Sequence, residues 1–432
     1  MGCDTQQSNQ GWTIRGLIMN RTVFEPARNV PVTHEADVVV CGGGTAGVAA
    51  AVCAARLGLK VIIIENSAQF GGMMSAVTAW SGDVDNKGGF VKEVFQYMAD
   101  NGIYSRPRYN PCALVTYFDQ LIVEHNITPL LLTRVVSAVM EHNTVEGVIV
   151  ESKQGRHAVM GRIIIDATGD GDVAALAGAE FEYGRPSDGR IQSLSLPLLV
   201  NNYHLRDMIN LKDDLLPRLQ AVKPGYELPY DAGNMRPMHG TTASMWLMLS
   251  HDWECDVLNA ESLSRSMIKL REQSIEIVKL IDQAYSTKLE IGTFAPLPGV
   301  RESRRIICEA MVTDQDFIDG NFYEDAIFTV RHNVDIHRCK DGEPAIIVTE
   351  IKPYQIRYGS LIPRGLNHLL VVGRCIGGSH QALASYRLVS DCMAMGEAAA
   401  LAAKQAVSKN CALRGVSIET IRSKMSEVGY QL

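Results

Sequence analysis

The sequence predicts an α/β fold: a parallel sheet with covering helices and a small antiparallel β-meander, joined to a mixed α+β region. Three observations predict it. An apolar run at 38–41 leads through glycines and an alanine-rich stretch to a second apolar run at 61–64, the order of a strand, a helix and a strand. An alternating pattern that predicts short strands begins at Pro129. Residues 190–350 carry no such unit, and a buried-strand pattern returns at 369–374.

The first unit, residues 36–72, is expected to form the centre of the sheet. Residues 38–41 read Val-Val-Val-Cys, an apolar run typical of a parallel strand buried on both faces. Residues 46–57 predict a helix, whose many alanines let it lie close to a sheet, and Gly58 ends it. Residues 61–64 predict the second buried strand.

The turn between this strand and helix fits the pattern G-x-G-x-x-G with Gly42, Gly44 and Gly47. The first glycine allows a tight turn, the second lets a pyrophosphate approach the backbone, and the third lets the helix pack closely. The amides and dipole of the helix N-terminus would face the anion. Glu65 ends the second strand, where a ribose needs an acceptor, and an acid there argues against a 2′-phosphate. A phosphate-free βαβ turn is the alternative, and the complete order of elements favours the nucleotide.

The chain between the first unit and residue 166 predicts two helices and the meander. Amphipathic helices are expected at 88–101 and 112–125. The meander strands are expected at 130–140, 145–151 and 156–160. They lead into an apolar strand at 162–166 that ends in Ala167-Thr168-Gly169.

Asp170 and Asp172 follow this strand within a glycine turn. Two carboxylates in such a turn serve as metal ligands or cap the following helix, here expected at 173–176. Capping is the favoured interpretation, and no metal site is predicted.

A basic cluster, Pro298 to Ile307, lies within the region that has no nucleotide motif. If it forms a strand, Arg301 and Arg305 share one face and Arg304 takes the other. Guanidinium groups bind carboxylates and phosphates through paired hydrogen bonds, which suits an anionic substrate. An internal salt-bridge network with Glu302 and Glu309 is equally compatible with the sequence.

Composition bounds the class of protein. The chain has 432 residues, 46% of them hydrophobic, and a formal charge of -7, so it can bury a large core and lacks the basic footprint of a nucleic-acid-binding protein. No apolar run is long enough for a membrane span, and the first residues lack a secretory pattern. The ten cysteines form no C-x-x-C pair, which indicates reduced thiols in a cytoplasmic protein. A homo-oligomer is left open.

Several stretches together resemble a bacterial-type family of FAD-dependent oxidoreductases with the glutathione-reductase-type nucleotide fold. They are EPARNVPV, CGGGTAG, ENSAQFGG, IIDATGDGD, PGVRESRR and SLIPRGLNHLLVVGRCIGGSHQALASYRLVSDCMAMGEAAA. The resemblance implies FAD and a Rossmann-like domain made of residues 36–185 and 351–432. Residues 186–350 are then the substrate domain, and residues 1–35 a tail and lead-in.

The resemblance also implies which residues contact FAD. The expected set is Gly42, Gly44, Thr45, Ala46, Gly47, Glu65, Asn66, Gly71, Gly72, Met73, Val135, Val136, Ala167, Thr168, Gly169, Gly373, Arg374, Ser379 and His380. One departure is Gly373-Arg374, since the wider flavoprotein pattern has Gly-Asp there, and Arg374 is expected to contact the pyrophosphate instead. A second G-x-G-x-x-G is missing from the sequence, which argues against a disulfide reductase supplied by a nicotinamide domain.

The expected reaction is hydride exchange between FAD and a small polar substrate, with an electron donor or acceptor that the sequence leaves unknown. His380, in a glycine-rich loop, is the expected proton-transfer group, and a histidine with only a local hydrogen bond is its alternative. Tyr386 and Arg387 follow one and a half helical turns later and are expected to face the same cavity. Arg301 and Arg304 are the expected substrate anchors.

Two other readings are kept open: an enzyme that resembles thiazole-forming enzymes and consumes NAD, and a non-catalytic scaffold. The absorbance spectrum of the purified protein separates the three. We expect flavin bands near those of free FAD. Released adenylated nucleotide would indicate the NAD-consuming enzyme, and a colourless, ligand-free protein would indicate the scaffold.

Overall fold

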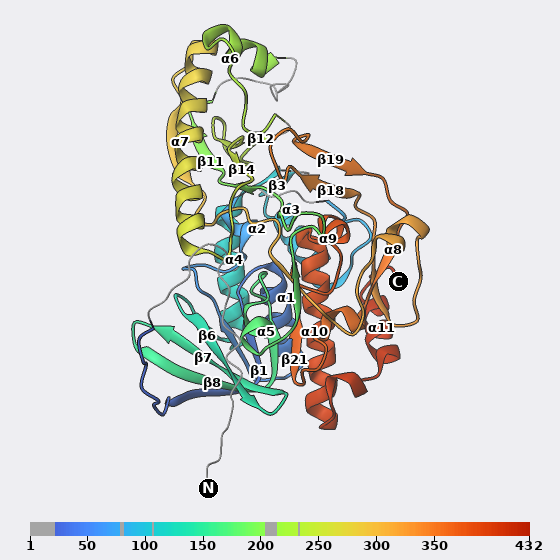
Figure 1. The fold of residues 1–432 in the computed structure, drawn as a ribbon. Coiled ribbons are helices and arrows are strands. Elements are labelled where there is room, and N and C mark those ends of the chain that lie inside the picture. The colour runs from blue at the N-terminus through green and yellow to red at the C-terminus, as the bar shows by residue number, and fades with distance from the viewer. Residues whose placement is uncertain (1–21, 78–81, 106–107, 204–213, 232–233) are drawn as a thin grey trace.

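The computed structural model describes residues 22–77, 82–105, 108–203, 214–231 and 234–432. Most of the predicted N-terminal tail, residues 1–21, lies outside this range. Figure 1 shows a body built around one sheet, with a lobe carrying the long helix α7 above it.

The main sheet is mixed, and its centre is parallel. Its strands, in spatial order, are β5 (Thr128–Leu130), β2 (Val61–Ile64), β1 (Val32–Cys41), β8 (Gly155–Asp166), β7 (Thr144–Ser152) and β6 (Arg134–Glu141), with β21 (Leu369–Val371) also paired to β8. β1 lies parallel to both β2 and β8, with Val38 opposite Val61 on one side and Ile163 on the other. The apolar run of β1 is therefore covered by strands at both edges, as its composition predicts.

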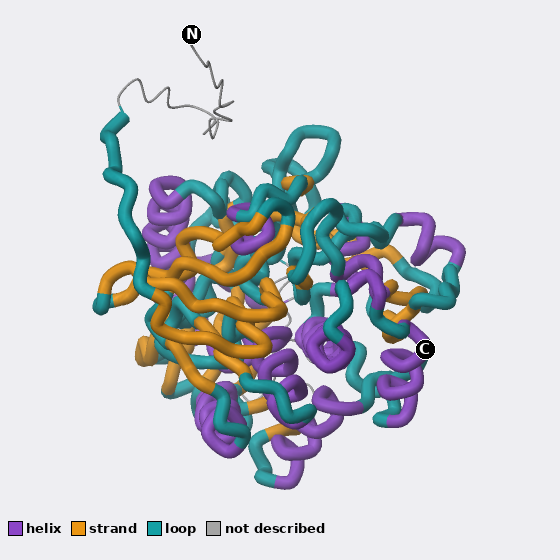
Figure 2. The backbone as a smooth tube through the Cα atoms, turned by 90° about the horizontal axis from the view of Figure 1, so that it is seen from below, coloured by secondary structure: helices purple, strands orange, loops and turns teal. Residues whose placement is uncertain are grey.

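β8 joins the parallel sheet to the meander. The two strands expected at 156–160 and 162–166 are one continuous strand of 12 residues. Its first half pairs antiparallel with β7, and its last residues pair parallel with β21 at the same edge. The predicted α/β fold, with a parallel sheet and an antiparallel meander, is confirmed, and its strands are drawn in orange in Figure 2.

Helices cover the sheet. They are α1 (Thr45–Arg56), α2 (Met73–Ala76), α3 (Gly89–Asp100), α4 (Pro111–Glu124), α5 (Asp172–Leu176) and α10 (Val389–Lys409). The predicted helices at 46–57, 88–101 and 112–125 agree with α1, α3 and α4 to within a residue at each end. α1 packs along α10 (Figure 1), where Gly396 brings the two backbones together: a Cβ at Gly396 would lie 2.2 Å from the carbonyl oxygen of Ala46.

The lobe has a core of its own. It is built from β11 (Leu198–Asn201), β12 (Asn234–Pro237), β13 (Met245–Met248), β15 (Glu290–Phe294), α6 (Leu216–Val222) and α7 (Ala260–Tyr285). α7 is amphipathic, and its apolar face places Ile277 and Ile281 in one core with Leu198 and Val200. This core is separate from the one around the main sheet.

Residues after about 304 return to the body. β16 (Arg304–Ile306) pairs with β9 (Phe181–Tyr183), β17 (Ala326–Val330) with β20 (Tyr354–Arg357), and β18 (Val334–His337) with β19 (Ile346–Thr349). Ile306 and Phe328 belong to the core of the main sheet. The region 186–350 therefore contributes to both cores, and its definition as one substrate domain stays a prediction.

Short elements complete the described chain. They are β3 (Tyr104–Ser105), β4 (Arg108–Tyr109), β10 (Leu194–Ser195), β14 (His251–Asp252), α8 (Asp314–Asp319), α9 (His380–Tyr386), α11 (Ile418–Glu427) and two 3-10 turns at Tyr358–Leu361 and Leu413–Gly415. The described cysteines are free thiols, and most are buried. Within the described ranges, no helix combines the length and apolarity needed to cross a membrane.

The contact between α1 and α10 generates a stability prediction. Gly396→Val forces a side chain against backbone that cannot move aside, so we expect it to cost about 1–3 kcal/mol and to lower the midpoint of thermal unfolding. Gly415→Val is the matched control, because a Cβ there would meet no atom within 4 Å. Equal midpoints for the two variants would contradict the close packing.

Candidate functional site

A cavity of about 1230 Å³ lies at the C-terminal ends of β1, β2 and β8. Ligands of open α/β sheets bind at this edge, where the strand-to-helix turns meet. The cavity continues from the β1–α1 turn to residues of the lobe, such as Met248, and to β18. Its volume exceeds the range of about 300–1,000 Å³ typical of small-molecule sites, so it has room for a dinucleotide and a second small molecule.

The three glycines of the β1–α1 turn differ in what surrounds them. Gly42 has φ +104°, and a Cβ on it would lie 2.4 Å from the carbonyl oxygen of Ala167. A Cβ on Gly47 would lie 1.8 Å from the carbonyl oxygen of Gly42. A Cβ on Gly44 would meet no protein atom within 4 Å. The fold itself therefore requires the first and third glycines, whereas the second leaves a cradle open to the cavity.

Polar groups surround this cradle. Gly44 is the N-cap residue of α1 and offers no side-chain cap, so the first amides of the helix keep their hydrogen-bonding capacity for a ligand. The Glu65 carboxylate is held at the end of β2 by the amides of Gly43 and Ser67, each 2.6 Å from one of its oxygens. A fixed acid beside free helix amides fits the sugar and the diphosphate of an adenine dinucleotide.

Most of the predicted FAD contacts line the cavity. They are Gly42, Gly44, Thr45, Ala46, Glu65, Asn66, Gly72, Met73, Val135, Ala167, Thr168, Gly169, Gly373 and Arg374. The predicted residues that are not part of the lining are Gly47, Gly71, Val136, Ser379 and His380.

The prediction that Asp170 and Asp172 cap the next helix was wrong. α5 has Gly171 as its N-cap residue and no side-chain cap. Asp170 instead accepts a hydrogen bond from Nη2 of Arg374 at 2.9 Å, and Asp172 pairs with Nη1 of Arg304 at 2.8 Å. Among the described residues, no group of acids, histidines and cysteines is arranged to hold a metal ion.

Asp166, at the end of β8, accepts a hydrogen bond from an amide of α5, the role expected of Asp170 and Asp172. Its carboxylate accepts hydrogen bonds from the amide of Ala174 at 2.9 Å and from the amide and hydroxyl of Thr168. The hydroxyl of Thr168 accepts in turn from the amide of Asp172. Burial raises the pKa of Asp166 to about 6, although these hydrogen bonds oppose the rise.

Arg374 also fits an anionic ligand. Its Nη2 is paired with Asp170, whereas its buried Nη1 has no hydrogen-bond partner among the described residues. A buried guanidinium nitrogen without an acceptor is costly unless a ligand supplies one. Arg374 lines the cavity together with Gly44.

The arginines of the basic cluster differ in their surroundings: one lines the cavity, and another belongs to an internal salt-bridge network. Arg301 lies before β16 rather than in it, so it does not share a strand face with Arg305, and it lines the cavity. Arg305 is 1% exposed and pairs with Glu302 at 2.5 Å, which makes it part of an internal network. Glu309 is not in that network, since it pairs with Arg414 at 2.7 Å.

His380 and Tyr386 lie in α9, and neither is part of the cavity lining. Nδ1 of His380 lies 2.8 Å from Oε1 of the buried Glu302. Tyr386 is fully buried, and its hydroxyl lies 3.4 Å from the carbonyl oxygen of Ile376. Arg387, the next residue, does line the cavity. Their catalytic roles stay predictions.

A cluster of rings that the sequence analysis did not identify lies at the lobe end of the cavity. Tyr230 stacks on His251 with centroids 3.7 Å apart, and His337 stacks on Tyr230 at 5.3 Å. Nε2 of His337 lies 3.2 Å from Oδ1 of Asp335, and its buried Nδ1 has no partner among the described residues. Burial and the charge of Arg301 lower the pKa of His337 to about 3, so its ring is neutral near pH 7.

One sequence signal could have found part of this cluster. Asp335 and His337 are two residues apart in a short apolar strand, and such residues share a face. The approach of His337 to Tyr230 and to Arg301 depends on tertiary structure, which the sequence pattern does not report.

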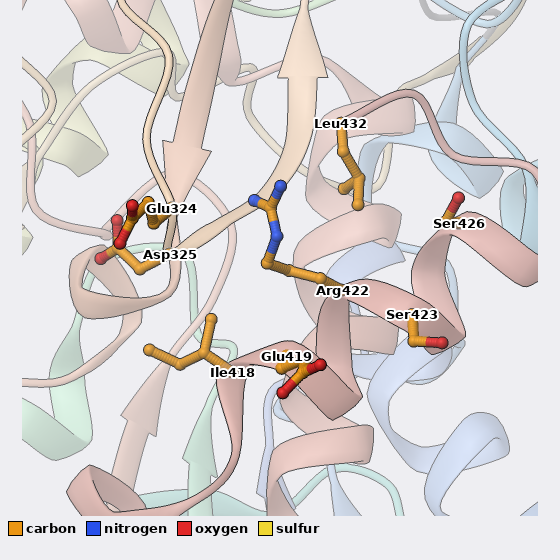
Figure 3. A pocket seen from close by; sticks show the side chains of 8 residues that line it. All are labelled: Glu324, Asp325, Ile418, Glu419, Arg422, Ser423, Ser426 and Leu432. Carbon is orange, nitrogen blue, oxygen red and sulfur yellow. The ribbon is translucent and has the colours of Figure 1, made fainter.

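A second hollow of about 590 Å³ lies against α11 and shares no lining residue with the cavity (Figure 3). Its arginine, Arg422, donates to the carbonyl oxygens of Tyr323 and Ala326, which holds the end of β17 on the helix. The residues around this hollow are far from the glycine cradle in sequence, and the hydrogen bonds of Arg422 attach α11 to the body.

Comparison with known families decides between the readings of this site. A model of the family described as FAD dependent oxidoreductase matches residues 37–425. The chain belongs to this family. FAD is therefore its cofactor, and redox catalysis its activity, which argues against the NAD-consuming and scaffold alternatives. The match includes the glycine turn, the lobe and α10 of this FAD dependent oxidoreductase.

Other similarities are narrower or more distant. Mitochondrial dihydrolipoyl dehydrogenase of Caenorhabditis elegans is 50% identical over 46 residues, which is 11% of this chain and only 9% of that curated relative. Among solved structures, a geranylgeranyl bacteriochlorophyll reductase-like protein from Thermoplasma acidophilum has 12% identity and a TM-score of 0.44, with 92% of both chains covered. The flavin-dependent brominase Bmp2 has 13% identity and a TM-score of 0.44, with 91% of this chain and 83% of that chain covered.

The cradle at Gly44 generates a binding prediction. Gly44→Val is expected to fold, because Gly44 has φ -69° and open space around it, but to fill the position of the diphosphate. We expect the FAD bound per chain to fall about tenfold or more, a loss of at least about 1.4 kcal/mol, with an unchanged far-UV circular dichroism spectrum. Gly415→Val is the control and should keep its FAD. A Gly44→Val protein with full FAD would contradict the assignment of the cradle.

Proposed function

We propose that this enzyme exchanges hydride between FAD and a small polar organic substrate bound at the lobe end of the cavity. The observation that carries the proposal is the continuity of one cavity, which is lined by Gly44 and Glu65 at one end and by Arg301, Tyr230 and His337 at the other. A molecule at the lobe end would share this cavity with a dinucleotide at the glycine end.

The residues that would hold FAD follow from the fit of the cradle. The amides at the start of α1 would bind the diphosphate, Glu65 the ribose, and Nη1 of Arg374 an oxygen of the diphosphate or of the chain that follows it. When bound, FAD supplies the hydride chemistry. The chain binds and orients both molecules, excludes water and moves protons.

His337 has better geometry for proton transfer than His380. Its Nδ1 has no partner among the described residues and its ring lines the cavity, while Oδ1 of Asp335 lies 3.2 Å from Nε2 and would favour the tautomer with the proton there. Burial and the charge of Arg301 disfavour the imidazolium that would form if Nδ1 took up a proton, whereas the Asp335 carboxylate would stabilise it. His380 faces Glu302 within the network of Arg305, so its replacement is expected to act on that network first.

Two variants separate these histidines. A substrate is first found by anaerobic screening of small polar compounds for bleaching of the bound flavin. With that compound, His337→Gln should keep its FAD but lower kcat by about 10²–10⁴-fold, the usual range for loss of a general acid or base. His380→Gln should lower the unfolding temperature, because it removes a partner of Glu302, and should leave kcat almost unchanged. The opposite result, with kcat lost only in His380→Gln at full FAD content, would return the role to His380.

A further inference from the structure

The lobe end of the cavity carries an excess of positive charge. Arg236, Arg301 and Arg387 all line it, and the acid among them is Asp335. These groups interact with one another, since Arg301 feels the charges of Arg387, Asp335 and Arg236. Arg301 and Arg387 outnumber Asp335 among the described residues of this cluster, which leaves this end positive, because the neutral His337 adds no charge.

Two of these arginines are held by neutral acceptors. Nη1 of Arg301 donates to the carbonyl oxygen of Ser193 at 2.8 Å and to the hydroxyl of Ser195 at 3.1 Å. Arg387 donates to the carbonyl oxygens of Arg301 at 3.3 Å and Asp335 at 2.8 Å. The neighbouring Arg305 pairs instead with a carboxylate. The charges of Arg301 and Arg387 are thus positioned without being neutralised by an ion pair.

Partial removal from water disfavours the charged forms of Arg301 and Arg387. Burial lowers the pKa of Arg301 to about 10 and also lowers the pKa of Arg387. Asp335 cannot compensate for all of them, because one of its oxygens faces His337. Arg301 and Arg387 are half-buried at the cavity wall, and neither forms an ion pair with a described residue, so this end of the cavity would favour an anionic ligand.

The nitrogens of Arg301 that do not bond to described residues indicate which kind of anion would fit. The bonds of Arg301 to described residues use Nη1, which leaves Nε and Nη2 as a two-pronged edge. Such an edge matches the two coplanar oxygens of a carboxylate. Beside it, the rings of Tyr230 and His337 line the cavity and would contact the carbon skeleton of a small acid, which a free phosphate lacks.

We propose that the lobe end of the cavity is a carboxylate-binding substrate subsite, in which Arg301 and Arg387 bind the carboxylate and Tyr230 and His337 contact the adjoining carbon skeleton. This inference rests on the proposed function and names its substrate class: a small organic acid. Bound there, the carboxylate supplies negative charge to Arg301 and Arg387 and places the rest of the molecule in the same cavity as FAD.

The test measures binding of carboxylate probes to the holoenzyme by isothermal titration calorimetry, without turnover. Benzoate and succinate are the probes, and benzamide and succinamide are their neutral counterparts. We expect at least one of the two acids to bind at least tenfold more tightly than its amide. Arg301→Gln should lower the affinity for that acid by about 10–100-fold, the range for loss of a hydrogen bond to a charged group. Arg301→Lys should lower this affinity less.

Arg357→Gln is the matched control, since Arg357 pairs with Asp325 outside the cavity and should not affect binding. FAD content, read from the flavin absorbance of each variant, shows that the fold is intact. Binding of neither acid, equal binding of acid and amide, tighter binding of inorganic phosphate, or an unchanged affinity in Arg301→Gln with full FAD would overturn the subsite. Failure of the proposed function would look different: the acids would bind, but no organic acid would bleach the flavin.

Discussion

The close approach of the β1–α1 turn to the end of β8 is the contact on which the rest of the site depends. Gly42 passes so near Ala167 that a side chain would overlap its carbonyl oxygen, and Gly47 lies directly over Gly42. This spacing starts α1 beneath the cavity and leaves its amides uncovered at Gly44. Since α1 packs along α10 through Gly396, the same contact also positions the C-terminal part of the chain.

β8 extends this constraint to the meander. One edge of the strand pairs with β1 from Ala158 to Asp166, while the other edge is shared by β7 and β21. Gly161 lies between the two partners, at the point where the antiparallel pairing stops. Strands far apart in sequence therefore end at one place, and Arg374, which follows β21, meets Asp170, which follows β8.

Local patterns predicted the elements but not the whole site. The glycine turn, α1 and β2 are visible in sequence because each depends on spacing within one short segment. The cluster of Tyr230, Arg301, His337 and Arg387 joins segments that only tertiary packing brings together, so no spacing reports it. The capping assignment of Asp170 and Asp172 failed for a related reason: Asp166, from the preceding strand, already served the amides of α5, and distant arginines bound the two acids.

The separate core of the lobe has a consequence for how such enzymes diversify. One wall of the cavity is built on the lobe, whereas the dinucleotide cradle is built on the main sheet. Mutations in the lobe can reshape that wall without disturbing the strands around Gly42. Evolution can thus alter substrate preference in one module while inheriting the redox machinery of the other unchanged.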